Sequence, residues 1–207
     1  MKHSIALCAL MGSLAAAPSV QADGFYFGLG LGGTSAKSDA VFGGLGTSEL
    51  KTAVVGLTGG YRWALASGFA AAELDADISL ESAFKNTATG ATCPTPGSTG
   101  AYYCKHDATV RLRGIYGMPL AGGWEGYGAL GYGVVMGDSG TSGITAGSAM
   151  NGGVSLGLGA QKTMGDGKLR IELNHDKFDN VLKHASGSPF EGSYRATSLK
   201  ATYLFGF

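Results

Sequence analysis

The sequence predicts an all-β fold, an eight-stranded antiparallel up-and-down transmembrane β-barrel. Three observations lead to this prediction. Eight segments alternate apolar and polar residues with a period of two, the connections between them are alternately long and short, and aromatic residues gather at one end of the segments. Beyond residue 22, no stretch has the roughly 20 consecutive apolar residues that a membrane-spanning helix requires.

Residues 1–22 differ from the rest of the chain and are expected to be a cleaved secretory signal peptide. Lys2 precedes an apolar run, and small residues up to Ala22 form a site typical of signal peptidase. Residues 23–207 would then form one domain, the barrel. Without Lys2 the 15 basic residues become 14, against 15 acidic ones. This balance gives no basic excess that would favour nucleic-acid binding.

The segment 70–81 shows the alternation most clearly. Its even positions hold only Ala, Leu and Ile, whereas four of its odd positions hold Glu73, Asp75, Asp77 and Glu81. On a helix these acids would spread around the circumference, but on a strand they all point to one side. The segment is therefore predicted to be a strand with one apolar and one acidic face.

Seven further segments follow the same rule and complete the set of eight strands. Their apolar faces, from the first strand to the last, hold Phe25, Phe27, Leu29 and Leu31; Val55, Leu57, Tyr61 and Trp63; Val110, Leu112 and Tyr116; Leu130, Tyr132, Val134 and Met136; Met150, Val154, Leu156 and Leu158; Leu169, Ile171 and Leu173; and, in the terminal strand 194–207, Tyr203, Phe205 and Phe207.

The connections between these strands alternate in length. Transmembrane barrels of outer membranes have short periplasmic turns and longer outer loops, so both chain ends are expected on the periplasmic side. A soluble barrel or sandwich would turn its apolar face inward, but eight strands enclose too little volume for two apolar layers. The expected connections are 34–49, 64–67, 82–106, 119–123, 138–148, 164–167 and 179–193.

Aromatic residues mark the periplasmic ends of the predicted strands. Aromatic rings favour the boundary between hydrocarbon and water, so these residues are expected to form a girdle on the lipid-facing surface. The girdle would consist of Phe25, Trp63, Tyr116, Trp124, Phe205 and Phe207.

Cys93 and Cys104 are the only cysteines after residue 22, and the ten residues between them are rich in Pro, Gly, Ser and Thr. Such a pair in an exported chain predicts a disulfide that closes a loop. A metal site is the alternative, but His106 does not complete a set of four ligands. No metal and no cofactor are therefore expected.

Three passages resemble the small outer-membrane β-barrel family of OmpA-like and opacity-type surface proteins: "GFYFGLGLGGT" at 24–34, "LRIELNHDKFDN" at 169–180 and "TYLFGF" at 202–207. The resemblance implies a place in the outer membrane of a Gram-negative bacterium, in contact with its lipid and lipopolysaccharide. It also implies that Tyr203, Phe205 and Phe207 form the signal read by the outer-membrane assembly machinery. The family contains surface antigens, adhesins, narrow pores and a few enzymes.

The polar faces of the strands would line the barrel lumen. If the strands pair symmetrically around the 82–106 loop, Asp77 faces Arg111 and Asp75 faces Arg113. These charges form either a packed ion network or an ion path, and the narrow interior of an eight-stranded barrel favours the packed network. The expected luminal charges are Arg62, Glu73, Asp75, Asp77, Glu81, Arg111, Arg113, Glu125, Arg170, Glu172 and Lys200.

The function expected from these features is a structural, surface-exposed role in the bacterial envelope, without catalysis. One alternative is an adhesin or host-contact protein acting through the disulfide-closed 82–106 loop, which carries Tyr102 and Tyr103. The other is a narrow porin-like channel.

An enzyme is disfavoured. Lipid A deacylases of this architecture carry a serine two residues after a strand histidine, whereas Lys177 holds that position after His175. His175 is also expected to face outward while Asp176 faces the lumen, because adjacent strand residues point to opposite sides.

Overall fold

The computed structural model describes residues 23–38, 47–90, 92, 102–140, 147–183 and 194–206. The expected signal peptide, Cys93 and Phe207 lie outside the described residues.

Within these ranges the chain forms long strands, two short strands and one turn of 3-10 helix. In the described part of the chain, no helix is long and apolar enough to cross a membrane. The elements in order are β1 (Gly24–Ser38), β2 (Ser48–Leu65), β3 (Gly68–Ser79), β4 (Lys85–Asn86), β5 (Tyr102–Tyr103), β6 (Ala108–Pro119), η1 (Ala121–Gly123), β7 (Trp124–Gly140), β8 (Gly147–Met164), β9 (Gly167–Lys183) and β10 (Tyr194–Phe205).

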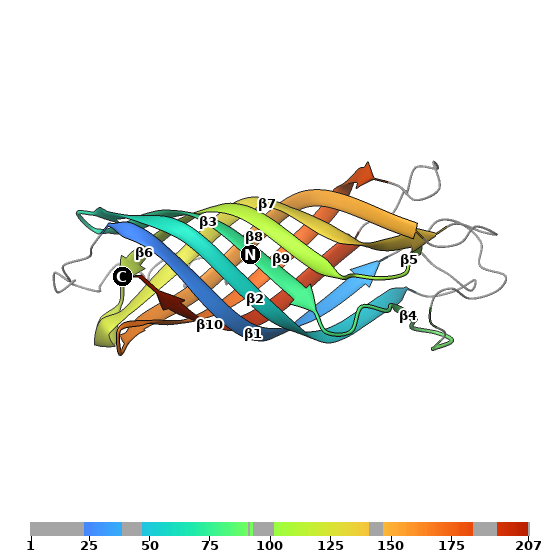
Figure 1. Cartoon of the computed structure of the whole chain (residues 1–207), viewed down its shortest axis with the longest axis horizontal. Coiled ribbons are helices and arrows are strands. Elements are labelled where there is room, and N and C mark those ends of the chain that lie inside the picture. Colours follow the sequence, from blue (N-terminus) through green and yellow to red (C-terminus); the bar gives the residue numbers. More distant parts are fainter. Residues whose placement is uncertain are drawn as a thin grey trace, which may run out of the picture.

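The eight long strands close into a ring (Figure 1). Each pairs antiparallel with its neighbours in the chain order of the long strands, and β10 returns to pair with β1. The closing register places Phe27 opposite Phe205 and Leu31 opposite Ala201. Closure satisfies the backbone hydrogen bonds of every long strand, which lipid cannot do. The predicted eight-stranded up-and-down barrel is confirmed.

Five strands run further on the side of the long loops than the sequence predicts, namely β1, β2, β7, β8 and β9, whereas β3 ends earlier. The first connection shortens from 34–49 to 39–47, and the last from 179–193 to 184–193. The reason is that backbone pairing continues after the apolar alternation stops, so that Lys37 still pairs with Glu49 and Arg195. The barrel wall therefore continues beyond the apolar band on its outer side.

The turns on the opposite side are short, as predicted. β8 ends at Met164 and β9 begins at Gly167, and Gly165 adopts a φ of 62° in the tight turn between them. This is a backbone conformation that glycine adopts without strain.

The outer surface of the barrel is apolar. Phe25 is 79 % exposed, Leu158 70 % and Leu112 65 %. Aromatic rings contact each other across neighbouring strands near the short turns, with 4.9 Å between the ring centres of Phe27 and Phe205 and 4.7 Å between those of Phe25 and Tyr61. The expected girdle of aromatic residues is present at this end, with Phe207 outside the described residues.

The exposed apolar face gives a direct test of lipid contact. Leu112 points outward from the middle of β6, between Leu74 on β3 and Tyr132 on β7. Leu112→Arg is expected to lower the free energy of unfolding in lipid vesicles by about 2–4 kcal/mol, because the charge enters hydrocarbon. Denaturant titration of the folded protein in vesicles measures this change.

The matched control is Ser35→Arg, which places the same charge outward at the outer end of β1. It is expected to cost less than about 1 kcal/mol. An equal effect of the two substitutions would show that the face carrying Leu112 does not contact lipid.

Candidate functional site

The candidate site is the lumen, where the inward positions of the strands bring the charged residues together. Twelve charged side chains of the described residues are buried, six of them cationic and six anionic. The interior is therefore neutral as a whole. The cations are Arg62, Arg111, Arg113, Lys168, Arg170 and Lys200, and the anions are Glu73, Asp75, Asp77, Glu125, Glu172 and Asp176.

Arg111 organises the outer ion cluster, nearest to the long loops. Its Nη1 lies 2.9 Å from Asp75 Oδ2 and 2.6 Å from Asp77 Oδ2. Its Nη2 lies 2.7 Å from Asp176 Oδ2, on the far wall of the barrel. Lys200 Nζ approaches the same two β3 carboxylates, at 2.5 Å from Asp75 and 2.7 Å from Asp77. Two cations thus hold three carboxylates that would repel one another alone.

Arg113 and Arg170 organise the middle ion cluster. Glu73 lies between them, with Oε1 2.5 Å from Arg113 Nη2 and Oε2 2.5 Å from Arg170 Nη1. Arg113 Nη1 also lies 2.7 Å from Glu172 Oε1 and donates to Asn174 Oδ1 at 2.7 Å. Every charge in this cluster contacts an opposite charge, as a dry interior demands.

Two tyrosines complete the middle cluster. The Tyr26 hydroxyl donates to Glu73 at 2.6 Å, and the Tyr127 hydroxyl donates to Glu172. The Arg170 guanidinium carbon lies 5.0 Å from the centre of the Tyr127 ring and 5.7 Å from that of Tyr26. The rings therefore fill the space beside Arg170 while their hydroxyls satisfy the carboxylates.

Arg62 and Glu125 form the inner ion cluster, nearest to the short turns. Their side chains make two parallel hydrogen bonds of 3.0 and 3.2 Å. Glu125 also accepts from Lys168 at 2.9 Å and from Gln161 at 2.8 Å. The Arg62 guanidinium stacks over the ring of Phe69, 3.8 Å from its centre. The paired geometry is the strong form of an arginine–carboxylate contact.

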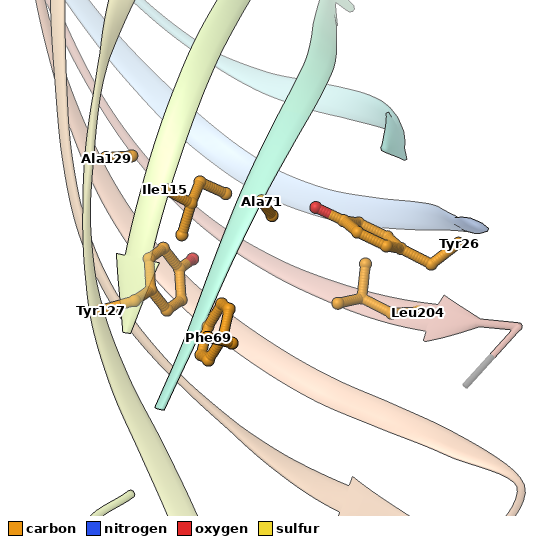
Figure 2. Packing of buried hydrophobic residues seen from close by; sticks show 7 residues of the cluster. All are labelled: Tyr26, Phe69, Ala71, Ile115, Tyr127, Ala129 and Leu204. Carbon is orange, nitrogen blue, oxygen red and sulfur yellow. The ribbon is translucent and has the colours of Figure 1, made fainter. Parts of the chain in front are cut away.

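Apolar side chains pack beside the inner ion cluster. Figure 2 shows them pointing toward the interior from β1, β3, β6, β7 and β10. They leave the short-turn end of the lumen filled by packed side chains. The set consists of Tyr26, Phe69, Ala71, Ile115, Tyr127, Ala129 and Leu204.

A second aromatic group, the outer aromatic cap, lies at the long-loop end and consists of Phe84, His106, Phe178 and Tyr194. All four are at most 2 % exposed. The Tyr194 ring centre lies 5.7 Å from that of Phe84 and 5.4 Å from that of Phe178. Phe84 belongs to the connection between β3 and β6, so this connection reaches into the mouth of the barrel.

His106 in this cap is held in its neutral form. Burial lowers the pKa of His106 to about 4, and the positive charge of Arg111 acts in the same direction while Asp176 opposes it. Its Nδ1 is hydrogen-bonded to the Tyr194 hydroxyl and its Nε2 to the Thr109 hydroxyl, at 2.8 Å.

Two sequence predictions about the lumen are wrong. Glu81 is exposed, because β3 ends at Ser79 and the inward alternation ends with it. The register between β3 and β6 is shifted by two residues from the symmetric pairing that the sequence predicts. Arg111 therefore faces Asp75, and Arg113 faces Glu73. The two expected ion pairs still occur as diagonal contacts, with Arg113 Nη2 3.7 Å from Asp75.

The structure places the remaining expected charges in the lumen and adds partners that the sequence prediction did not include. Asp176 faces inward as predicted and binds Arg111, a contact that the list of expected luminal charges lacks, although the alternation with His175 is sufficient to find it. Lys168 and Gln161 lie near the ends of their strands, where the sequence pattern is weak. Phe84 carried no signal, because it lies in a long connection.

Comparison with known proteins agrees with this architecture. A profile of the family described as "Outer membrane protein beta-barrel domain" matches residues 4–204. The chain belongs to this family. A search of curated protein sequences finds no match.

Solved structures of similar barrels are distant in sequence. Neisserial surface protein A is 14 % identical, with a TM-score of 0.52, and the match covers 88 % of this chain and 97 % of that one. Ail, the attachment invasion locus protein of Yersinia pestis, is 13 % identical, with a TM-score of 0.48 and coverage of 87 % and 98 %. The first of these shares the fold with this chain.

Removing the central arginines tests whether the ion network supports the barrel. Arg111→Ala with Arg113→Ala leaves five carboxylates with too few cations, and breaking one buried pair costs about 3–5 kcal/mol. The double variant is expected to lose its folded gel band at a much lower temperature than the wild type. Comparing boiled and unboiled samples across a temperature series measures this.

The control replaces Lys105 and Lys177 with Ala. Both lysines form exposed ion pairs, with Asp138 and Asp179, which contribute little to stability. If the arginine variant were as heat-stable as this control, the network would not hold the barrel together.

The buried His106 predicts a pH dependence. The unfolded chain binds a proton at His106 near pH 6.5, whereas the folded chain binds it only near pH 4. Stability is therefore lost as the pH falls through this window, by on the order of 3 kcal/mol. His106→Gln is expected to remove this part of the pH dependence, whereas His175→Gln, at an exposed site, keeps it. Identical slopes of unfolding free energy against pH in the wild type and His106→Gln would contradict the assignment.

Proposed function

We propose that the protein is a structural, surface-exposed component of the outer membrane and that it has no catalytic activity. The neutral, filled lumen carries this proposal. The three ion clusters occupy its length, and aromatic side chains pack at both ends. Charges that are fully paired with one another stabilise the wall but offer no open path or reactive group.

The arrangement around His175 supports the absence of catalysis. His175 Nδ1 is hydrogen-bonded to the Thr197 hydroxyl at 2.9 Å on the outer face. The acid next to it in the sequence, Asp176, points into the lumen and binds Arg111. A nucleophile and base need a third group that orients the base, and Asp176 does not supply it.

Single-channel recording tests the closed lumen. The full chain, reconstituted in planar bilayers after its folded gel band has been verified, is expected to give no discrete currents. A pore protein treated with the same detergent serves as the positive control. Reproducible currents whose size or ion selectivity changes in Lys200→Gln would instead make the luminal charges an ion path.

A role in envelope integrity predicts a phenotype. Deleting the gene in its own bacterium is expected to increase the entry of detergents and large antibiotics, and expression of the chain from a plasmid is expected to restore the barrier. The Arg111→Ala and Arg113→Ala double variant is expected not to restore it. Unchanged sensitivity of the deletion strain would count against a structural role.

A second candidate function is host contact through the segment between β3 and β6. This segment is built onto the barrel wall, because β4 pairs with β2, β5 pairs with β7, and Phe84 is buried in the mouth. The segment thus provides an ordered base outside the membrane. Ordered contact surfaces bind at a lower entropic cost than flexible loops.

The predicted disulfide would restrain the same segment. Cys104 is buried, and Cys93 lies outside the described residues, so the bond stays a prediction. A disulfide between Cys93 and Cys104 predicts that the unfolded chain migrates faster on a gel without reductant than with reductant. The Cys93→Ser variant is expected to show no such difference.

Trimming the segment tests the host-contact function. Replacing residues 91–101 by a short Gly-Ser linker, together with Cys104→Ser, leaves β4 and β5 in place. Binding of expressing cells to host cells is expected to fall if this segment is the contact surface. A linker of equal length in place of residues 184–193 is the control, and equal loss of binding in both variants would contradict a specific role of the segment.

We further propose that Tyr203 and Phe205, with Phe207, are read by the outer-membrane assembly machinery. Both described rings are on the outer face of β10, with 4.8 Å between their centres. Their outward position supports a contact with another protein during insertion.

A further inference from the structure

A cavity opens in the outer part of the barrel wall, where β2 separates from the segment that follows β3. The pairing between β2 and β3 ends with Val54 opposite Ser79, and it resumes with Glu49 opposite Lys85 in β4. From 54 to 49 is five steps along β2, whereas from 79 to 85 is six steps along the facing segment. The extra residue lets the facing segment bend away from β2.

The facing segment is held away from β2 by pairing on its other side. Phe84 N–H donates to Cys104 C=O, and His106 N–H donates to Ser82 C=O, both at 2.9 Å. Because Phe84 points into the barrel mouth, Ala83 points outward and lines the cavity. The cavity has a volume of about 230 Å³. Pockets for drug-sized ligands have roughly 300–1,000 Å³, so this cavity fits a group about as large as one amino-acid residue.

Lys51 on β2 presents backbone groups without a partner to this cavity. Alternate residues of a strand direct their N–H and C=O to the same neighbouring strand. On this side of β2, Ala53 C=O accepts from Leu80 N–H and Thr47 C=O accepts from Thr87 N–H, each at 2.9 Å. Among the described residues, no backbone hydrogen bond joins Lys51 to the facing segment. The ladder therefore lacks a partner at one position, and the cavity lies there.

The charged side chains that line the cavity leave a positive excess. Lys51, Lys85 and Glu81 take part in no ion pair within the described part of the chain. Glu49, the second acid of the lining, is neutralised by Lys37, with 2.5 Å between Lys37 Nζ and Glu49 Oε1. Two ammonium groups thus face the cavity together with one uncompensated carboxylate.

We propose that this cavity binds the C-terminal residue of a polypeptide. In an antiparallel ladder, a residue exchanges two hydrogen bonds with the residue opposite, through its own N–H and C=O. A C-terminal residue can do this with Lys51, because its amide N–H donates to the Lys51 C=O and its carboxylate accepts from the Lys51 N–H.

The charges of the lining match such a ligand. The carboxylate of the terminal residue is attracted by the ammonium groups of Lys51 and Lys85, while Glu81 disfavours a second negative charge. The lining therefore favours a ligand with one carboxylate and an adjacent amide N–H. Such binding requires only that the outer end of the barrel stands in water, and it is independent of a role in envelope integrity or host contact.

Isothermal titration calorimetry of the folded full chain in a neutral detergent tests this binding, with N-acetyl-trialanine as the probe. Two matched probes each lack one feature. The C-terminal amide of the probe lacks the carboxylate, and a probe whose last amide is N-methylated lacks the N–H. The wild type is expected to bind N-acetyl-trialanine with a Kd below about 1 mM, and each matched probe at least about tenfold more weakly.

Two variants separate the charges from the cavity itself. Lys51→Gln with Lys85→Gln removes both ammonium groups, whereas Ala83→Leu fills the cavity and leaves them in place. Each variant is expected to bind the probe at least about tenfold more weakly than the wild type. The control, Lys177→Gln with Lys183→Gln, removes two exposed lysines from β9 and is expected to bind like the wild type.

Absence of saturable binding by the wild type, equal binding of the C-terminal amide, or unchanged binding in Ala83→Leu would overturn the proposal. Equal loss of binding in the control and in the lysine variant would overturn it too, because the attraction would then come from the general surface charge. Tighter binding of glucuronate than of the tripeptide would show that the site takes a sugar acid instead. Boiled and unboiled gel samples of every variant are compared first, so a barrel that does not fold is distinguished from a cavity that does not bind.

Discussion

Ion pairs that cross the lumen are the interactions on which the rest of the structure depends. Arg111 on β6 contacts Asp176 on β9, and Arg62 on β2 contacts Glu125 on β7, although neither pair of strands is adjacent in the ring. Each contact joins opposite walls. Their charges balance, so a ring that is apolar outside can bury twelve charges inside without a net charge in its interior.

The glycines make room for these long side chains. A Cβ at Gly56 would lie 2.6 Å from Lys200 Cδ, and one at Gly157 would lie 2.8 Å from Asn174 Oδ1. Both distances are too short for real contacts, so larger residues would push the network out of place. Part of the high glycine content, 37 of 207 residues, thus follows from the width of an eight-stranded lumen.

The fold could be predicted from the sequence because alternation with a period of two is a local signal. The alternation alone places Asp75, Arg111 and Lys200 in the lumen and Leu112 on the outer surface, and it does so without the strand register. The register itself depends on the length and path of the β3–β6 connection, so the symmetric pairing of Asp77 with Arg111 was wrong. The outer aromatic cap could not be predicted, because Phe84 reaches the mouth through backbone pairing in that connection, with Phe84 N–H donating to Cys104 C=O at 2.9 Å.

Because the lumen is packed with paired charges and aromatic side chains, functional contacts are to be sought on the outside of the barrel. The wall extends past the apolar band and supports the segment between β3 and β6. The proposed function assigns contact with lipid and other molecules to these surfaces, with the packed interior keeping the wall rigid beneath them.

A double-mutant cycle across the lumen tests the central claim most directly. Arg111→Met, Asp176→Leu and the double variant are compared with the wild type by denaturant unfolding in lipid vesicles. The account predicts that the double variant is more stable than the sum of the single effects implies, with a coupling of at least about 1.5 kcal/mol. Additive single effects would show that the two walls are not held together through the lumen.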